Sequence, residues 1–147
     1  MDNEEMKLTN QLCFSAYNVN RLFGKFYEQQ LKQFGLTFSQ YLVLLALWEE
    51  SPQTLLSIGG KLDLASNTLT PVLKRLERDG WVKREKSESD KRQLIVTLTE
   101  KGHQEKNAVH KAISECIAGE FDLDEYLRAK AIMDNLELTL SKLLKDG

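Results

Sequence analysis

The chain has 147 residues, of which 41% are hydrophobic and 29% charged, as in a soluble globular protein, and its formal net charge is −2. No apolar run approaches the ~18 residues of a membrane span, and the acidic start MDNEEMKLTN has no apolar region typical of a signal peptide. We therefore expect a cytoplasmic protein without membrane contact. In such a protein, two cysteines do not make a structural disulfide framework.

Positive charge is concentrated in the middle of the chain. Residues 74–99 carry eight basic and five acidic side chains, whereas the segments before and after them are both net negative. A basic block in an acidic chain favours a polyanionic partner. The alternative is a solvated helix face with mixed charges.

Two helices are predicted before residue 50. Apolar residues recur at steps of three and four from Leu8 to Phe34, which predicts one long amphipathic helix ending near Gly35. Thr37 or Ser39 then caps a second, strongly apolar helix.

A helix-turn-helix and a hairpin are predicted next. Residues 55–62 are typical of a short helix, although Gly59 and Gly60 each cost ~1 kcal/mol in a helix interior. A three-residue link leads to a helix over residues 66–78, and Asp79-Gly80 ends it. Two β-prone runs, 81–86 and 94–98, flank a polar turn and predict a hairpin that serves as a wing.

Two further helices complete the chain. Thr99 and Glu100 open a fifth helix with Cys116 on its apolar face, and Asp122 caps a sixth. The predicted fold is therefore mainly α with a small β-hairpin wing, a winged helix-turn-helix.

The second helix of a helix-turn-helix places its first residues against base edges in the major groove of DNA. The residues predicted to lie there are Ser66, Asn67, Thr68, Thr70 and Pro71. Lys74 and Arg75 follow one turn later and are expected to reach phosphates. The alternative is that Ser66 only caps the helix.

The wing supplies a second set of predicted DNA contacts, namely Lys86, Asp90, Lys91 and Arg92. A basic side chain at a wing tip can enter the narrow, negative minor groove. Asp90 is expected to hold Arg92 through a hydrogen-bonded ion pair. The alternative is an ordinary surface hairpin.

Three segments resemble the MarR family of winged-helix regulators, and within it the organic-hydroperoxide-resistance (OhrR) branch. They are NQLCFSAY (10–17), LTFSQYLVLLALWEE (36–50) and LASNTLTPVLKRLERDGWVKREKSESDKRQLIVTLTEKG (64–102). The resemblance implies a homodimer that binds an inverted-repeat operator in double-stranded DNA, usually as a repressor. It also implies three segments: an N-terminal dimerisation helix (1–36), the winged helix-turn-helix (37–100) and C-terminal dimerisation helices (101–147).

The resemblance further implies that Cys13 is a peroxide-sensing thiol, with Tyr17 and Tyr27 matching two tyrosines around it and Phe38 standing at the third position. Tyr27 is fourteen residues from Cys13, roughly 21 Å along a helix at ~1.5 Å per residue. If Tyr27 serves the thiol, it must therefore come from the other subunit. The alternative is that Cys13 packs as a small hydrophobic residue.

Cys116 is the second cysteine, and the resemblance to the two-cysteine type of these regulators implies a resolving thiol. A sulfenic acid at Cys13 would condense with it to form an intersubunit disulfide that releases DNA. The alternative is that Cys116 packs in the core.

Three other functions are compatible with parts of the sequence. A regulator that responds to a small molecule would bind it in a pocket lined by Trp48 and phenylalanines. A thiol peroxidase is disfavoured because the chain lacks a Cys-x-x-Cys motif, and a winged helix used only for protein contact is disfavoured by the basic block. His103 and His110 are a weak metal signal at a spacing of seven. We expect no enzyme activity, metal or cofactor.

Overall fold

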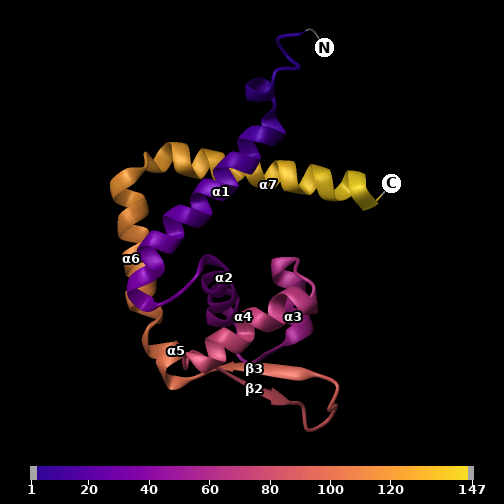
Figure 1. The fold of residues 1–147 in the computed structure, drawn as a ribbon, viewed down its shortest axis with the longest axis vertical. Helices are drawn as coiled ribbons and strands as arrows, with labels where there is room; N and C mark the ends of the chain where they lie inside the picture. Colours follow the sequence, from indigo (N-terminus) through magenta and orange to yellow (C-terminus); the bar gives the residue numbers. More distant parts are fainter. Residues whose placement is uncertain (1–2, 146–147) are drawn as a thin grey trace. The chain divides into compact units, whose positions relative to one another are not determined.

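The computed structural model describes residues 3–145. The elements are α1 (Leu12–Leu31), α2 (Phe38–Glu49), β1 (Gln53–Thr54), α3 (Leu55–Leu62), α4 (Ser66–Arg78), β2 (Val82–Lys86), β3 (Leu94–Leu98), α5 (Glu100–Gln104), α6 (Lys106–Glu120) and α7 (Leu123–Lys145), with short 3₁₀ turns at Leu8–Asn10 and Lys32–Phe34 (Figure 1). The chain divides into two compact units between His110 and Lys111. Residues 1, 2, 146 and 147 of the expected dimerisation segments lie outside the described residues.

The predicted fold class is confirmed, because a mostly helical chain carries a helix-turn-helix followed by a β-hairpin. The start of α2 decides between the two predicted caps. Thr37 Oγ1 accepts a hydrogen bond from the Gln40 amide, and the Gln40 side chain accepts one from the Thr37 amide, at 3.2 and 2.8 Å. Thr37 is therefore the cap.

None of the helices in the described part of the chain has the length and hydropathy of a membrane span.

Three elements differ from the sequence predictions. The first α-helix begins at Leu12, because residues 8–10 form a 3₁₀ turn, and a second 3₁₀ turn precedes Gly35, whose φ of 70° ends the segment. The predicted fifth helix is two helices, α5 and α6, on either side of Glu105. The sheet has a third strand, β1, that the sequence pattern did not reveal because it has only two residues.

The sheet has the strand order β1-β3-β2, and both pairings are antiparallel. Val96 of β3 is paired with Gln53 on one side and Arg84 on the other. Beyond Ile95, the hairpin continues towards its tip as two strands only, through the pair Lys86–Leu94. Figure 1 shows β2 and β3 running side by side to the turn that connects them. The sheet therefore has three strands only at Ile95 and Val96 in the middle of β3, and the part of the hairpin towards its tip has two strands.

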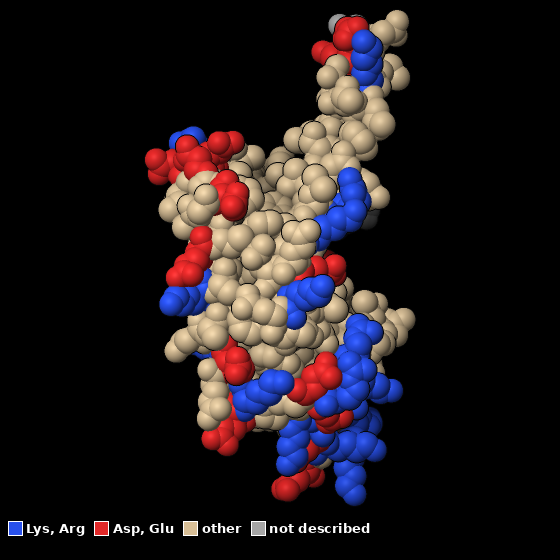
Figure 2. All heavy atoms as spheres, turned by 60° about the vertical axis from the view of Figure 1, so that its left-hand side comes forward, with Lys and Arg blue, Asp and Glu red and all other residues tan. Residues whose placement is uncertain are grey.

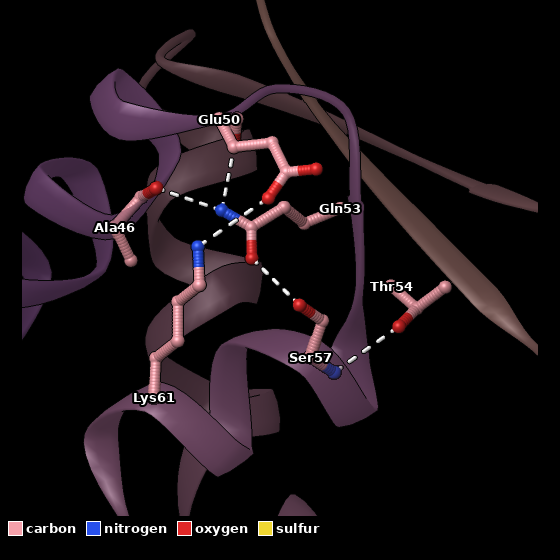
Figure 3. Close-up of polar contacts among 6 residues, drawn as sticks. All are labelled: Ala46, Glu50, Gln53, Thr54, Ser57 and Lys61. Carbon is pink, nitrogen blue, oxygen red and sulfur yellow. Dashed lines mark hydrogen bonds and ion pairs between the residues drawn. The ribbon is translucent and has the colours of Figure 1, made fainter.

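The junction between α2 and α3 is fixed by one buried side chain, Gln53 (Figure 3). Its Nε2 donates to the carbonyl oxygens of Ala46 at 2.7 Å and Glu50 at 2.6 Å, and its Oε1 accepts from Ser57 Oγ at 2.8 Å. Thr54 caps α3 by accepting from the Ser57 amide at 3.1 Å. These bonds join the last turn of α2, where the Ala46 carbonyl also accepts from the Glu50 amide at 3.3 Å, to the start of the helix-turn-helix.

The turn of the helix-turn-helix is tight. Asp63 takes the left-handed conformation with a φ of 55°, and the Leu64 amide donates to the Gly59 carbonyl at 2.9 Å. The chain thus folds back on the middle of α3. A Cβ on Gly59 would lie 2.8 Å from the Leu64 carbonyl oxygen, whereas a Cβ on Gly60 would meet nothing within 4 Å.

Candidate functional site

The predicted recognition helix is α4, and its first turn is exposed. Ser66, Asn67 and Thr68 are all exposed, whereas Thr70 is half-buried and donates its hydroxyl to the Ser66 carbonyl at 2.7 Å. The alternative that Ser66 is an N-cap is wrong, because Ala65 holds that position and makes no side-chain cap. The short polar side chains at this end of α4 are therefore accessible to a ligand.

The rest of α4 separates into two faces. Leu69, Val72, Leu73 and Leu76 are buried, which anchors the helix on the core. Pro71, Lys74 and Arg75 are exposed. The side chains predicted to reach DNA thus lie on the solvent side of a well-anchored helix.

The segment after α4 is held by contacts with the start of α5. Thr99 Oγ1 donates to the Gly80 carbonyl at 2.6 Å, and Lys101 Nζ donates to the Asp79 carbonyl at 2.9 Å. The Lys101 ammonium also lies 4.8 Å from the centroid of the buried Trp81 ring. These contacts fix the C-terminal end of α4 without using its exposed face.

The wing tip contains the ion pair expected from the sequence. Asp90 Oδ1 accepts from the Arg92 amide at 3.0 Å and from Arg92 Nε at 3.3 Å, while the Arg92 side chain remains 94% exposed. Ser87 is buried at the base of the turn and donates its amide to the Gln93 carbonyl at 2.9 Å. Arg92 is therefore held by Asp90 at its amide and its Nε, while nearly all of its side chain is exposed to solvent. Lys86 and Lys91 are also exposed.

Basic side chains gather on this part of the molecule. Figure 2 shows Lys and Arg clustered at the lower end of the view, the end that the hairpin occupies in Figure 1, with fewer acidic side chains among them. Four cations of residues 74–99 are paired with carboxylates: Arg78 with Asp79 at 3.0 Å, Lys83 with Glu85 at 2.7 Å, Arg84 with Glu77 at 3.1 Å and Arg92 with Asp90 at 3.3 Å. The hydrogen bond from Arg78 lowers the pKa of the Asp79 carboxyl. The surface is suited to a polyanion.

The cysteines lie in different environments. Cys13 is an exposed free thiol on α1, and Tyr17, one turn later on the same helix, is 64% exposed. Cys116 is a half-buried free thiol on α6. The two cysteines belong to different compact units.

Tyr27 is part of an aromatic cluster where α1 meets α2. Its ring centroid lies 5.2 Å from that of Phe38 and 5.6 Å from that of Tyr41. Phe38 therefore stacks on Tyr27. With Tyr27 fourteen residues from Cys13 on α1, the estimated separation remains roughly 21 Å, and the structure does not bring this tyrosine to the thiol of its own chain.

Two helices present apolar side chains to solvent. On α1 these are Leu12, Tyr17, Val19 and Leu22, and on α7 they are Leu123, Leu127, Ile132, Met133, Leu138, Leu140, Leu143 and Leu144. Many large apolar side chains exposed on one helix are typical of an interaction surface.

A hollow of about 180 Å³ lies beside α2, lined by Tyr41, Leu45, Trp48, Glu49, Lys106 and His110. Trp48 lines this hollow, and its Nε1 donates to the Gly102 carbonyl at 2.9 Å. The six lining residues include none of the phenylalanines that the small-molecule alternative placed with Trp48. Among the described residues, no group of three or more His, Cys, Asp or Glu side chains is placed to hold a metal ion.

Comparison with known proteins assigns the fold and site to a family. The sequence profile of the family described as "Transcriptional regulator SarA/Rot" matches residues 25–109. The chain belongs to the SarA/Rot family. Over 99 residues, the chain is 46% identical to the organic hydroperoxide resistance transcriptional regulator of Bacillus subtilis, an alignment that covers 67% of each chain.

Solved structures give the same assignment over nearly the whole chain. Reduced AbfR bound to DNA is 64% identical with a TM-score of 0.88, covering 98% of this chain and 99% of AbfR, a protein of Staphylococcus epidermidis. The disulfide form of AbfR is 63% identical with a TM-score of 0.69, covering 97% and 95%. A MarR regulator from Methanosarcina mazei shares the fold at 24% identity and a TM-score of 0.72, covering 90% and 96%. The expected MarR-like, OhrR-related identity is confirmed, and the two-cysteine type stays a prediction.

Sequence reasoning did not single out two sets of residues in this SarA/Rot winged helix: Gln53 with its carbonyl partners, and the pair Glu77–Arg84 that joins α4 to β2. Neither set has a sequence signal, because each depends on a turn that brings separate elements together. Ser87 has the sequence context of an exposed turn residue, but the structure shows that it is buried.

Proposed function

We propose that this protein is a homodimeric transcriptional regulator that binds an inverted-repeat operator in the cytoplasm, represses transcription there and releases the DNA when Cys13 is oxidised. DNA binding and regulation are the function of its family, and its relative AbfR has been crystallised on DNA in the reduced state. The observation that carries the proposal is the joint exposure of the first turn of α4 and the tethered Arg92 at the wing tip.

DNA contacts are assigned to two elements. The first turn of α4 (Ser66, Asn67, Thr68), with Thr70 and Pro71 behind it, would lie against base edges in the major groove. Lys74 and Arg75 would contact phosphates. The wing would place Arg92 in the minor groove, positioned by Asp90 and flanked by Lys86 and Lys91.

The dimer is assigned to the outer helices. The exposed apolar side chains of α1 and α7 are the surfaces that a second copy would bury. This keeps residues 1–36 and 101–147 as the proposed dimerisation segments and 37–100 as the DNA-binding domain. Tyr27 would reach Cys13 only across such an interface.

The proposed redox response has two steps, oxidation of Cys13 and condensation with Cys116. The Cys13 thiolate attacks the terminal oxygen of an organic hydroperoxide, the O–O bond breaks, and the alcohol leaves after taking up a proton. The sulfenic acid then condenses with the Cys116 thiol of the second subunit, which forms the S–S bond and releases water. The exposed Cys13 thiol and the solved disulfide form of AbfR support this assignment.

The test measures affinity for DNA upstream of the protein's own gene before oxidation, after one equivalent of cumene hydroperoxide, and again after a dithiol reductant. We expect tight binding, loss on oxidation and recovery on reduction. Cys13→Ser should abolish the response. Cys116→Ser should abolish the intersubunit disulfide on a non-reducing gel, and a Cys116→Ser protein that still forms this bond would refute the role of Cys116.

A second candidate function is release of DNA by a small ligand bound in the hollow beside Trp48. The hollow of about 180 Å³ favours it. In that case binding to DNA would be indifferent to hydroperoxide, and Cys13 would be a packing residue. A thiol peroxidase would instead consume many equivalents of hydroperoxide in the presence of reductant, whereas a sensor reacts once and waits for reduction.

A further inference from the structure

One carboxylate joins α4 to the wing, the two elements to which DNA contacts are assigned. Glu77, in the last turn of α4, accepts three hydrogen bonds from Arg84 of β2: from the amide at 3.0 Å, from Nε at 3.3 Å and from Nη2 at 3.1 Å. The Arg84 side chain is only 20% exposed and that of Glu77 is 37% exposed. Main chain and side chain of the strand are thus both bound to one group on the helix.

The position of this clamp along the hairpin matters. Arg84 is paired with Val96, the residue that also pairs with Gln53, so the clamp acts where the sheet still has three strands. Beyond the next pair, Glu85–Ile95, the hairpin has two strands only towards its tip, and two-stranded ribbons twist more than larger sheets. Asp90 is six residues further on, up to roughly 20 Å at ~3.4 Å per residue. A tilt of roughly 5° at Arg84 would move the tip by roughly 2 Å over that length, enough to break a hydrogen bond.

Neither member of the clamp belongs to the predicted DNA contacts. Glu77 is negative, which by itself repels a phosphate backbone. Its three hydrogen bonds to Arg84 give this carboxylate a structural role apart from contact with DNA. The hydrogen bonds from Arg84 also lower the pKa of the Glu77 carboxyl, led by the backbone bond, so the clamp is charged at neutral pH.

We propose that Glu77 is a positioning residue for DNA binding, which sets the angle of the wing relative to α4 so that Arg92 and the first turn of α4 meet adjacent grooves together. This inference rests on the proposed DNA-binding function. It adds to that function a residue that acts through Arg84 and the wing, without contact with DNA.

The chain offers a matched control. Glu85 is the neighbour of Arg84 on β2, and it pairs with Lys83 on the same strand at 2.7 Å with 61% of its side chain exposed. Glu77→Gln and Glu85→Gln remove the same charge from the same region. If only net charge matters, both variants bind DNA more tightly, because each removes a repulsive carboxylate. If Glu77 positions the wing, Glu77→Gln binds more weakly, by about three- to tenfold, and Glu85→Gln does not.

Arg84→Lys supplies a second variant that leaves the net charge unchanged. Lysine cannot reproduce the fork of the guanidinium, so we expect Arg84→Lys to weaken binding as Glu77→Gln does. Circular dichroism at the assay temperature establishes that each variant is folded.

The deciding readout is a double-mutant cycle in operator affinity. Arg92→Ala should weaken the wild type but have little further effect in Glu77→Gln, because the wing no longer places Arg92 in its groove. Lys74→Ala, on α4 itself, should weaken both backgrounds equally. Independent effects of Glu77→Gln and Arg92→Ala would overturn the inference while leaving the proposed function intact. Wild-type protein that fails to bind the operator would overturn both.

Discussion

Two adjacent glycines in α3 face different surroundings, and replacing each by alanine separates sterics from helix propensity. A Cβ on Gly59 would lie 2.8 Å from the Leu64 carbonyl oxygen, against 3.4–4 Å for an ordinary contact, so the carbonyl would have to move by about 0.6 Å. That carbonyl belongs to the link whose amide bonds back to Gly59. A Cβ on Gly60 would meet nothing within 4 Å.

The magnitude follows from the comparison. Both variants gain up to ~1 kcal/mol of helix propensity, so this gain cancels in the difference between them. Overpacking against an immobile group costs ~1–3 kcal/mol. We therefore expect Gly59→Ala to be less stable than Gly60→Ala by about 2 kcal/mol, or roughly 4–8 °C in Tm for a chain of this size.

The assay is thermal and urea unfolding followed by circular dichroism. Protein concentration must be equal in all samples, because the stability of a dimer depends on it. Gly60→Ala should match or exceed the wild type. A Gly59→Ala protein as stable as Gly60→Ala would refute the argument that the tight turn excludes a side chain at residue 59.

Three further predictions concern other bonds of the winged helix. Gln53→Ala should destabilise the protein by about 1–3 kcal/mol in urea unfolding, because it removes the three hydrogen bonds of a buried side chain. Gln104→Ala, which removes an exposed hydrogen bond, should cost under ~0.5 kcal/mol. Because the pKa of Glu77 is lowered in the folded state, its carboxylate contributes stability at neutral pH that is lost as the pH falls below the ordinary carboxyl range. The free energy of unfolding of Glu77→Gln should therefore fall less between about pH 5 and 3 than that of the wild type. Equal slopes of unfolding free energy against pH would contradict this. Lys91→Ala should reduce the slope of log affinity against log salt concentration by about 1. Lys111→Ala is the control, because the Lys111 ammonium lies 3.9 Å from Glu115 on α6, and it should leave the slope unchanged. Identical slopes for the two variants would argue against a phosphate contact by Lys91.

Periodicity and turn chemistry predicted the winged helix-turn-helix because its signals are local. The bounds of α3 and α4 follow from apolar spacing and the Asp79-Gly80 stop, and Asp122 caps α7 through hydrogen bonds from the Asp124 and Glu125 amides. The ion pair between Asp90 and Arg92 could be predicted from the sequence for the same reason, because the two residues are only two positions apart.

The parts that escaped prediction depend on tertiary contacts. β1 is a strand only because β3 pairs with it, and no alternation can show in two residues. The clamp between Glu77 and Arg84 spans the turn after α4. Tyr27 was assigned to a thiol from the resemblance, whereas its stacking on Phe38 and Tyr41 could only emerge from the packing of α1 on α2.

The two ends of α4 are held in contrasting ways. Its last turn and the residues after it are bound by Thr99, Lys101 and Arg84, whereas its first turn has no side-chain cap and makes its short polar side chains available to solvent. Substitutions in that first turn therefore remove little of what stabilises the fold. Related proteins can therefore differ in operator preference through substitutions in the first turn of α4 alone. The contacts at the last turn of α4 keep the fold the same.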